Sequence, residues 1–380
     1  MAIGKKKQKY KFYTTDNIDA KDATYNVIFG EMSNGKSFAV KMKILKNYLD
    51  GKGSGALIRR FEEQIKGTTG AKLMEDLYEN DLGINYIEKL TKGKYNTIVY
   101  KSKSGWYLAR NEEDKKILDD KPFCKPFALT LLANYDGTSN IDITTVLFDE
   151  FLTNKYYLID EFIIFQKLLS KIIRVRALGA VKIYMCGNTV DRNSPYIREM
   201  GLTNFLRMEQ GQIDIYSYGD SKLKVAVEYC GTTNKDNPKP SNDYFAFGNP
   251  KLSMIKTGSW EIDIYQHIIY SPKKGNDITK SIFLELDDEI IQGDIMEADD
   301  MVIVNWHKKT TLLKEEPEDL IFTLGDITRS LTFRDPFNTG LKISELLKKT
   351  YTLKRWYYAD NLTGDNVKRY LDRVQRVSYT

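Results

Sequence analysis

The stretch Gly30-Glu31-Met32-Ser33-Asn34-Gly35-Lys36-Ser37 decides how the first half of the chain is expected to fold. It fits the pattern G-x-x-x-x-G-K-[ST] of a phosphate-binding loop, or P-loop. The apolar run 25–29 before it has the composition of a strand, and residues 38–45 after it have that of a helix. Between a strand and a helix, the N–H groups of the loop and the positive end of the helix can converge on the same phosphates. The stretch therefore predicts a nucleotide-binding loop, and the alternative is a glycine-rich turn that happens to carry a lysine.

Each residue type in this pattern has a chemical task. The ammonium of Lys36 is expected to bind the β- and γ-phosphates, and the hydroxyl of Ser37 is expected to bind Mg²⁺. Further contacts to the phosphates are expected from the loop residues Gly30, Ser33, Asn34 and Gly35. ATP and Mg²⁺ are accordingly the expected ligands of this part of the chain.

The composition is that of a folded globular protein. Hydrophobic residues make up 42% and charged residues 29% of the 380 residues, and a chain of this length has room for about two domains. No run approaches the roughly 18 consecutive apolar residues of a membrane span, so no membrane contact is expected. Cys124, Cys186 and Cys230 lie far apart, without the spacing of a metal site, which fits an intracellular, reducing setting.

Charge is unevenly distributed along the chain, although the net charge is only +5. Residues 5–11 hold five lysines, and residues 341–380 hold nine Lys and Arg against four Asp and Glu. Residues 281–300 hold eight acidic side chains and no Lys or Arg. One basic face that attracts a polyanion is one interpretation of this pattern, and solvated tails with a solvated acidic edge are the other.

A second motif, Ile143-Thr144-Thr145-Val146-Leu147-Phe148-Asp149-Glu150, is an apolar strand pattern that ends in two acids. A P-loop ATPase needs one carboxylate near its Mg²⁺, and Asp149 fits that role. Hydrolysis also needs a group that activates or orients water near the γ-phosphate, and Glu150 is suited to it. The alternative is a strand that ends in two solvent-facing acids.

Asn188 ends another apolar run, 181–188. It is expected to sense the γ-phosphate, unless it is an ordinary turn residue at the end of a strand. Ligands of parallel sheets bind beyond the carboxyl ends of the strands, where Gly30, Asp149, Glu150 and Asn188 all fall. We therefore expect these residues to belong to one site.

Arginines could place a cation on the transferred phosphoryl group, which lowers the barrier of the reaction. Arg59 and Arg60 end the predicted strand 56–61, and Arg174 and Arg176 follow a predicted helix over 158–173. Arg59 is expected in the nucleotide site. Arg174 or Arg176 is expected to act on a neighbouring subunit, and surface arginines without a phosphate partner are the alternative.

Strands that alternate with helices predict an α/β fold with a mainly parallel sheet. A helix is predicted over residues 71–90 from the spacing of its apolar side chains. Residues 1–205 are expected to form a P-loop ATPase domain, and residues 206–252, with three prolines between 231 and 250, a linker segment or small linker domain. Residues 253–380 are expected to form a smaller α/β domain.

Several stretches form a combination that is met in one family. They are GEMSNGKS (30–37), LIRRF (57–61), TTVLFDEF (144–151), RVR (174–176) and IYMCGNTVDRNSPY (183–196). The combination, over roughly residues 20–205, resembles the DNA-encapsidation ATPases of small tailed bacteriophages. These are terminase-like motors of the additional-strand, catalytic-glutamate type of P-loop NTPase. The resemblance implies an N-terminal ATPase domain, a short linker domain and a C-terminal domain with an RNase H-like nuclease fold.

The resemblance also implies the partners and the setting of the chain. Members of the family assemble as a ring, usually a pentamer, at the portal of an empty procapsid, and they drive double-stranded DNA inward. The implied location is the cytoplasm of the infected bacterium, at the portal vertex. A scaffolding RNA at the portal is a further partner met in this family.

Roles for the matching residues follow from the same resemblance, and the P-loop lysine and serine keep the tasks given above. Asp149 would hold the Mg²⁺ shell, and Glu150 would be the catalytic glutamate. Asn188 matches the coupling motif. Arg176 or Arg174 matches the arginine finger that acts on a neighbouring subunit, and the short spacing after FDEF leaves the choice between them open.

The C-terminal part leaves a second activity open. Large terminases cut DNA with clustered acids that hold two metals. The candidates are Glu261, Asp263, Glu285, Asp287, Asp288 and Asp294. Motors of small phages package unit-length genomes, which implies a vestigial nuclease domain that contacts DNA, and an active nuclease is the alternative. A nucleotide-binding structural switch that does not act on DNA is the third interpretation.

Overall fold

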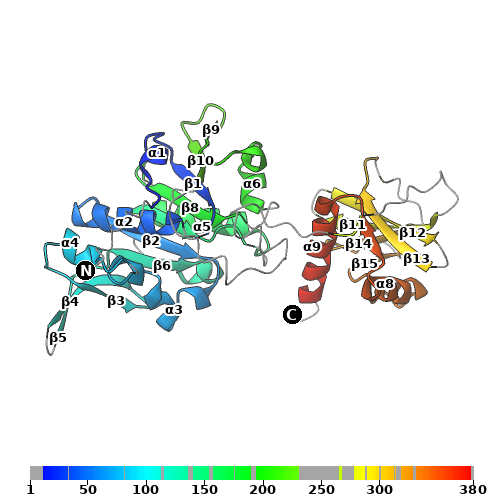
Figure 1. Ribbon diagram of the computed structural model, residues 1–380, viewed down its shortest axis with the longest axis horizontal. Coiled ribbons are helices and arrows are strands. Elements are labelled where there is room, and N and C mark those ends of the chain that lie inside the picture. The colour runs from blue at the N-terminus through cyan, green and yellow to red at the C-terminus, as the bar shows by residue number, and fades with distance from the viewer. Residues whose placement is uncertain are drawn as a thin grey trace, which may run out of the picture. The chain divides into compact units, whose positions relative to one another are not determined.

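The chain divides into two compact units, Met1–Glu261 and Ile262–Thr380, and Figure 1 shows the elements of each. The computed structural model describes residues 12–32, 34–80, 82–112, 115–135, 140–153, 157–174, 176–189, 194–230, 265–267, 278–286, 289–298, 301–311, 313, 318–327 and 331–377. Ser33 of the P-loop and residues 231–252 of the expected linker therefore lie outside the described residues.

A ten-stranded sheet forms the centre of the first unit. Its strands are β1 (Tyr25–Gly30), β2 (Ser54–Arg59), β3 (Thr97–Lys101), β4 (Gly105–Glu112), β5 (Lys115–Leu118), β6 (Cys124–Ala128), β7 (Ile143–Asp149), β8 (Lys182–Asn188), β9 (Ile213–Ser217) and β10 (Lys224–Cys230). Their order is β3-β4-β6-β2-β7-β8-β1-β10-β9, and β5 pairs with β4. All pairs from β6 to β10 in this order are parallel. The predicted α/β class with a mainly parallel sheet is confirmed.

Helices cover both faces of this sheet (Figure 1). They are α1 (Asp16–Asp19), α2 (Lys36–Leu49), α3 (Gly67–Lys72), α4 (Tyr86–Leu90), α5 (Glu161–Ile173) and α6 (Pro195–Glu199), with 3₁₀ segments at Glu62–Gln64, Glu75–Leu77, Leu129–Tyr135 and Phe205–Arg207. Successive side chains of a strand point to opposite faces. Leu147 of β7 accordingly belongs to the core beneath Val40 and Ile44 of α2, whereas the ring of Phe148 lies 5.0 Å from that of Phe165 of α5.

The helix predicted over residues 71–90 is wrong. The chain instead forms α3, the 3₁₀ turn Glu75–Leu77 and the short α4. Gly83 turns the backbone with φ 63°, and the Asn85 side chain accepts a hydrogen bond from the Glu88 N–H at 2.9 Å, which caps a new helix. The apolar spacing of the segment fits three short turns on a core as well as one long helix.

The first unit extends past residue 205, where we expected the ATPase domain to end. β10 pairs in parallel with β1 from Tyr25↔Val225 to Gly30↔Cys230, and β9 adds an antiparallel edge. Residues 213–230 are thus part of the large sheet, beside the strand that leads into the P-loop. The expected linker therefore does not begin at residue 206, and the rest of it, residues 231–252, lies outside the described residues.

The second unit is built on a six-stranded sheet with two helices on it. Its elements are β11 (Ile278–Leu286), β12 (Glu289–Ala298), β13 (Met301–Lys308), β14 (Leu320–Thr323), β15 (Thr332–Phe333), α8 (Lys342–Thr352), β16 (Trp356–Tyr358) and α9 (Asn361–Val377). The strand order is β15-β14-β11-β12-β13-β16. β12 runs antiparallel to β11 and β13, and the other neighbours pair in parallel.

The core of this unit lies between one face of the sheet and the helices α8 and α9. Leu347 of α8 and Tyr370 of α9 are fully buried there against Leu284 and Trp306. The rings of Trp306 and Trp356 lie 5.0 Å apart, which joins β13 to β16. In the part of the chain that the structure describes, no helix is long and apolar enough to cross a membrane.

Candidate active site at the carboxyl edge of the large sheet

The loop 31–35, part of the predicted P-loop, connects the end of β1 to the start of α2, which is the strand–loop–helix context that the sequence predicts. Gly30 has φ 149°, and a Cβ on it would lie 2.7 Å from Sγ and 2.8 Å from the carbonyl oxygen of Cys230 on β10. A side chain does not fit at that distance, so the loop needs glycine where it leaves the sheet. Gly35 has φ 92° and is the N-cap of α2. The loop therefore reaches the N-terminus of a helix, which is an anion-binding position.

Lys36 is buried and lies inside its own loop. Its ammonium donates to the carbonyl of Gly30 at 3.3 Å and to that of Glu31. It also contacts Oδ1 of Asn34 and Oδ1 of Asn188, each at 3.1 Å. Burial lowers the pKa of Lys36 below the usual 10.5, although nearby acidic groups oppose that shift. Because Gly30 and Asn188 are paired at the ends of β1 and β8, the predicted neighbourhood of Lys36 and Asn188 is present.

Ser37 and the two acids of β7 meet at the same edge of the sheet. The Ser37 hydroxyl donates to Oδ1 of Asp149. Oδ2 of Asp149 accepts a hydrogen bond from Nη2 of Arg59 at 2.7 Å, and Nη1 of Arg59 lies 2.6 Å from Oε2 of Glu150. The Asp149 side chain is 7% exposed and that of Glu150 is 55% exposed. One arginine thus connects a buried carboxylate and an accessible one.

These residues fit Mg²⁺ and a nucleotide on chemical grounds. Mg²⁺ prefers one or two carboxylates and other oxygen ligands, with the remaining positions on water and phosphate. The hydroxyl of Ser37 and the carboxylate of Asp149 are such a pair. Among the described residues, no group of three or more His, Cys, Asp and Glu could hold a metal by itself. The Nε of Arg59 is buried and has no acceptor among these residues, which leaves a donor at the site for an acceptor outside the chain.

Glu150 lies in a turn that the sequence pattern did not predict. Its φ is 59°, in the left-handed region that is uncommon for a residue with a Cβ. Arg60 donates to the backbone carbonyls of Glu150 and Phe151, and its Nε lies 2.8 Å from Oε2 of the buried Glu161. Of the two arginines considered for a phosphate contact, Arg60 thus has its guanidinium on the carbonyls of this turn and on Glu161, and its side chain is 4% exposed.

Comparison with known proteins places this architecture. No protein-family model matches the sequence, and no curated protein sequence matches it. A solved structure described as the Phi-28 gp11 DNA packaging motor is 15% identical, with 96% of this chain and 97% of that chain covered and a TM-score of 0.51. A chain from the bacteriophage Phi-29 viral genome packaging motor assembly is 14% identical, with 96% and 99% covered and a TM-score of 0.56. The chain has the fold of a phage DNA-packaging motor protein.

The N-terminal domain of the DNA packaging ATPase from bacteriophage phi29 is also similar. It is 16% identical, with 59% of this chain and 98% of that chain covered and a TM-score of 0.43. In the two matches with the higher scores the packaging-motor fold extends over 96% of this chain, so it includes the second unit.

The two arginines after α5 differ in this packaging-motor fold. The Arg176 guanidinium donates to the carbonyls of Ile141 at 3.2 Å, Ile172 at 2.6 Å and Ile173 at 3.0 Å, and it also contacts that of Ile143. Ile143 is the first residue of β7, so Arg176 lies at the edge opposite to that of the acids. Arg174 has φ 51° and an exposed side chain. The Arg176 guanidinium thus contacts four carbonyls of its own unit, whereas what the structure shows of Arg174 is an exposed side chain.

Of the acids considered for a nuclease, only Glu285 and Asp294 belong to the described residues. Asp294 is bound by its neighbours: its carboxylate lies 2.9 Å from Nε2 of His307 and accepts from the Ser281 hydroxyl at 2.7 Å and from Gln292 at 2.8 Å. Burial acts to raise the pKa of Asp294, but these hydrogen bonds lower it below the usual 3.8. The hydrogen bond between His307 and Asp294 raises the pKa of His307 above 6.5.

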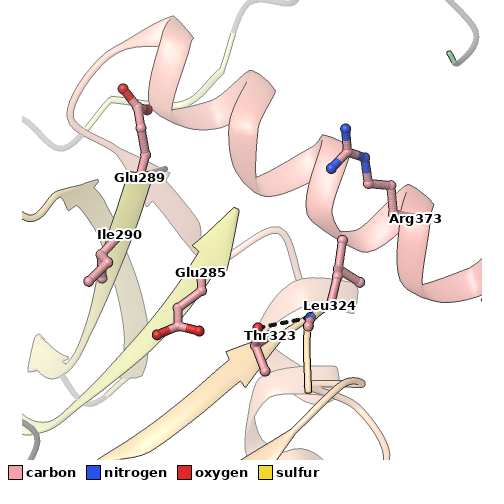
Figure 2. Close-up of a pocket in the computed structure, with 7 residues that line it drawn as sticks. Glu285, Glu289, Ile290, Thr323, Leu324 and Arg373 are labelled. Carbon is pink, nitrogen blue, oxygen red and sulfur yellow. Dashed lines mark hydrogen bonds between the residues drawn. The ribbon is translucent and has the colours of Figure 1, made fainter. Parts of the chain in front are cut away.

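Glu285 lies elsewhere in the second unit, at a cavity of about 550 Å³. Figure 2 shows Glu285 and Glu289 on neighbouring strands and Arg373 on the helix above them. Glu289 is already bound, to Lys308 at 2.5 Å and to Asn366 at 3.1 Å. The two described candidates, Glu285 and Asp294, therefore do not share a site, and the remaining four candidates lie outside the described residues.

Proposed function

We propose that this chain is an ATP-hydrolysing motor that translocates double-stranded viral DNA into a preformed procapsid through its portal. The observation that carries the proposal is the convergence of Lys36, Ser37, Asp149, Glu150 and Asn188 at one edge of a parallel sheet. A buried cation, a pair of oxygen ligands and an accessible carboxylate are the parts that phosphoryl transfer to water requires. The fold of phage packaging motors supports DNA as the polymer that is moved.

In this proposal Lys36 binds the β- and γ-phosphates of ATP, and Ser37 and Asp149 hold Mg²⁺ beside them. Bound Mg²⁺ neutralises part of the phosphate charge and so assists the attack. The carboxylate of Glu150 accepts the proton of the attacking water. Arg59 is paired with Oε2 of Glu150, so the carboxylate accepts the proton either on Oε1 or after it leaves Arg59, and its 55% exposed side chain has room to move.

The strand order supports the additional-strand, catalytic-glutamate type of P-loop NTPase. β8 is inserted between β1, which leads into the P-loop, and β7, which ends in the acids. Asn188 at the end of β8 then acts as the coupling residue. A γ-phosphate that draws Lys36 away removes the partner of the Asn188 side chain, and release of phosphate restores it.

For the second unit we propose a vestigial RNase H-like nuclease domain that contacts DNA. The antiparallel run β11-β12-β13, extended beside β11 by parallel β14 and β15, is the strand arrangement of that fold. Contacts to DNA phosphates would be independent of sequence and sensitive to salt. Exposed cations on or beside α8 and α9 that suit such contacts are Lys342, Lys348, Lys349, Lys354 and Lys368.

The proposed motor works as a homo-oligomeric ring, with a pentamer as the expected size. It docks at the portal vertex of the procapsid in the cytoplasm of the infected bacterium, and a scaffolding RNA there is a further candidate partner. The similar structures are of a DNA packaging motor and of a viral genome packaging motor assembly, which supports a ring and a portal as partners of this chain.

The test of the proposed function is the rate of ATP hydrolysis by the full chain with and without duplex DNA and procapsids. Stimulation by both is expected of a packaging motor. A rate that responds to neither favours a nucleotide-binding switch and contradicts the motor. Incubation with plasmid DNA and Mn²⁺ covers the remaining alternative, because clean cleavage would make the second unit an active nuclease.

Arg174→Ala is expected to lower the ATPase rate of the assembled ring by about 10³-fold or more, as the loss of an arginine finger does. Nucleotide affinity is expected to stay at the wild-type level, and the melting temperature is expected to fall less than in Arg176→Ala, because the Arg174 side chain is exposed. Arg176→Ala is expected to lower the melting temperature instead, since carbonyls of α5 and β7 lose their donor.

Calorimetry and ATPase rates of both variants separate the two roles. Arg110→Ala is a matched control, because Arg110 is also an exposed arginine, on β4, with a 51% exposed side chain. A mixture of Arg174→Ala and Glu150→Gln chains should regain part of the activity, since each subunit then completes the site of a neighbour. An Arg174→Ala ring with the wild-type rate would contradict the assignment.

A further inference from the structure

The turn that carries Glu150 is held by contacts outside it. Glu150 has φ 59°, which a residue with a Cβ adopts only where the surrounding structure imposes it. The N–H of Phe151 donates to the carbonyl of Cys186 on β8 at 3.2 Å, which fixes one side of the turn. The other side has to be fixed by groups that reach the carbonyls of the turn itself.

Arg60 supplies those groups. Its Nη2 donates to the carbonyl of Phe151 at 2.9 Å, and its Nη1 donates to that of Glu150 at 3.3 Å. Two successive peptide planes are thereby held by one planar guanidinium. The direction in which the Glu150 side chain leaves the backbone depends on these planes.

Arg60 is in turn oriented from below by a buried acid. Its Nε lies 2.8 Å from Oε2 of Glu161, whose side chain is 0% exposed. The other oxygen of Glu161 accepts a hydrogen bond from the Tyr196 hydroxyl at 2.8 Å. The guanidinium also lies 5.1 Å from the centre of the Tyr157 ring. The direction of the guanidinium is thus set by partners on α5 and α6 and by Tyr157.

A buried ion pair is weak evidence of a stabilising role, because desolvation offsets most of its attraction. The role of the guanidinium here is to fix directions. Its three donors lie in one plane and bind three acceptors at once, and a lysine ammonium on a flexible stem cannot make this arrangement of hydrogen bonds. α6, which carries Tyr196, begins at Pro195, and it is the first helix after Asn188 at the end of β8. The contacts therefore join the element that follows Asn188 to the turn that carries Glu150.

We propose that Arg60 is a positioning residue for the catalytic glutamate, and that Glu161 and Tyr196 orient it. This inference rests on the proposed ATPase function of the chain. In this role Arg60 contacts neither the nucleotide nor the attacking water. It holds the peptide planes of residues 150 and 151, and through Tyr196 a shift of α6 reaches the carboxylate that activates water.

The first test is Arg60→Lys in the full chain. Lysine keeps the charge opposite Glu161 but cannot hold both carbonyls, so the rate of single-turnover ATP hydrolysis is expected to fall by about 10²-fold, the scale of a misplaced catalytic group. The affinity for a fluorescent ATP analogue is expected to stay within about two-fold, because the P-loop is unchanged. Equal losses of rate and affinity, or a folded variant with the wild-type rate, would overturn the inference.

Tyr196→Phe keeps the test decisive if Arg60→Lys fails to fold. It removes only the hydroxyl that orients Glu161, and a smaller loss of rate at unchanged affinity is expected. The matched control is Tyr184→Phe, because the buried Tyr184 hydroxyl also donates to a carboxylate, that of Asp19 at 2.5 Å. Both variants should lower the melting temperature to a similar extent, but only Tyr196→Phe should slow hydrolysis. Equal rates for the two would overturn the inference.

Parallel measurements on wild type and on Glu150→Gln separate a failure of the positioning role from a failure of the ATPase function on which it rests. If wild type hydrolyses ATP and Glu150→Gln does not, the ATPase function holds, and the Arg60 and Tyr196 variants decide the positioning role alone. If wild type does not hydrolyse ATP, or Glu150→Gln is as fast as wild type, the proposed function fails and the positioning role fails with it.

Discussion

Glu150→Gln is expected to lower the single-turnover rate of ATP hydrolysis by about 10²–10⁴-fold, the usual contribution of a general base. Glutamine keeps the size of the side chain but cannot accept a proton from water. The affinity for ATP is expected to stay within about two-fold, because the phosphates are bound by Lys36 and its loop. The lost ion pair with Arg59 changes stability little, since the Glu150 side chain is 55% exposed.

Binding of a fluorescent ATP analogue and hydrolysis at saturating protein measure the two quantities separately. Glu112→Gln is a matched control, because Glu112 on β4 is also paired with an arginine and its side chain is 49% exposed. β4 is separated from β7 by β6 and β2 in the sheet. A Glu150→Gln protein with the wild-type rate would remove Glu150 from the reaction, and a slow Glu112→Gln protein would show that the effect is not specific to the site.

The parts of the site that depend on residues close together in the sequence could be predicted. The P-loop pattern fixes where β1 ends and α2 begins, because glycine is needed at φ 149° for Gly30 and at φ 92° for Gly35. The strand 143–149 and its terminal acid Asp149 follow from an apolar run and its end. Once two strands are parallel neighbours, their ends meet, which explains why Asn188 was expected near the loop and lies 3.1 Å from Lys36.

The roles of Arg59 and Arg60 could not be predicted, although the two residues are adjacent. Along a strand, successive side chains point to opposite faces, and the sequence does not say which face holds the site. Arg59 pairs with the two acids of the site, Asp149 and Glu150, whereas Arg60 pairs with the buried Glu161. No spacing pattern connects Arg60 to a residue about a hundred positions later in the chain.

The prediction that the first domain ends at residue 205 failed for a similar reason. β10 is separated from its partner β1 by most of the unit, and only the register Tyr25↔Val225 shows that they pair. Its sequence 224–230 is apolar enough for a buried strand, but composition does not say which sheet a strand joins. The change of texture near residue 205 therefore did not mark the end of the unit, which extends to Glu261.

Lys36→Met is expected to weaken ATP binding by about 10²-fold or more. The phosphates lose the charge-assisted hydrogen bonds that the buried ammonium of Lys36 donates in the loop. Methionine keeps much of the apolar stem, so the core around α2 is little changed. The carbonyls of Gly30 and Glu31 lose their donor, and a modest fall in melting temperature is expected as well. Titration with a fluorescent ATP analogue measures the first effect and calorimetry the second.

The pH dependence of binding distinguishes this charge from a structural role of Lys36. Only the protonated amine attracts phosphate, and burial lowers the pKa of Lys36 below 10.5. The affinity of wild type is therefore expected to fall as the pH rises, starting at a lower pH than an ordinary lysine would give, whereas the residual affinity of Lys36→Met should lack this step. Lys46→Ala, an exposed lysine near the other end of α2, is the control and should bind and titrate like wild type. If Lys36→Met kept the wild-type affinity and its pH profile, the phosphates would not be bound at this loop. The position of Ser37, Asp149 and Glu150 beside the loop would then no longer support a nucleotide site there.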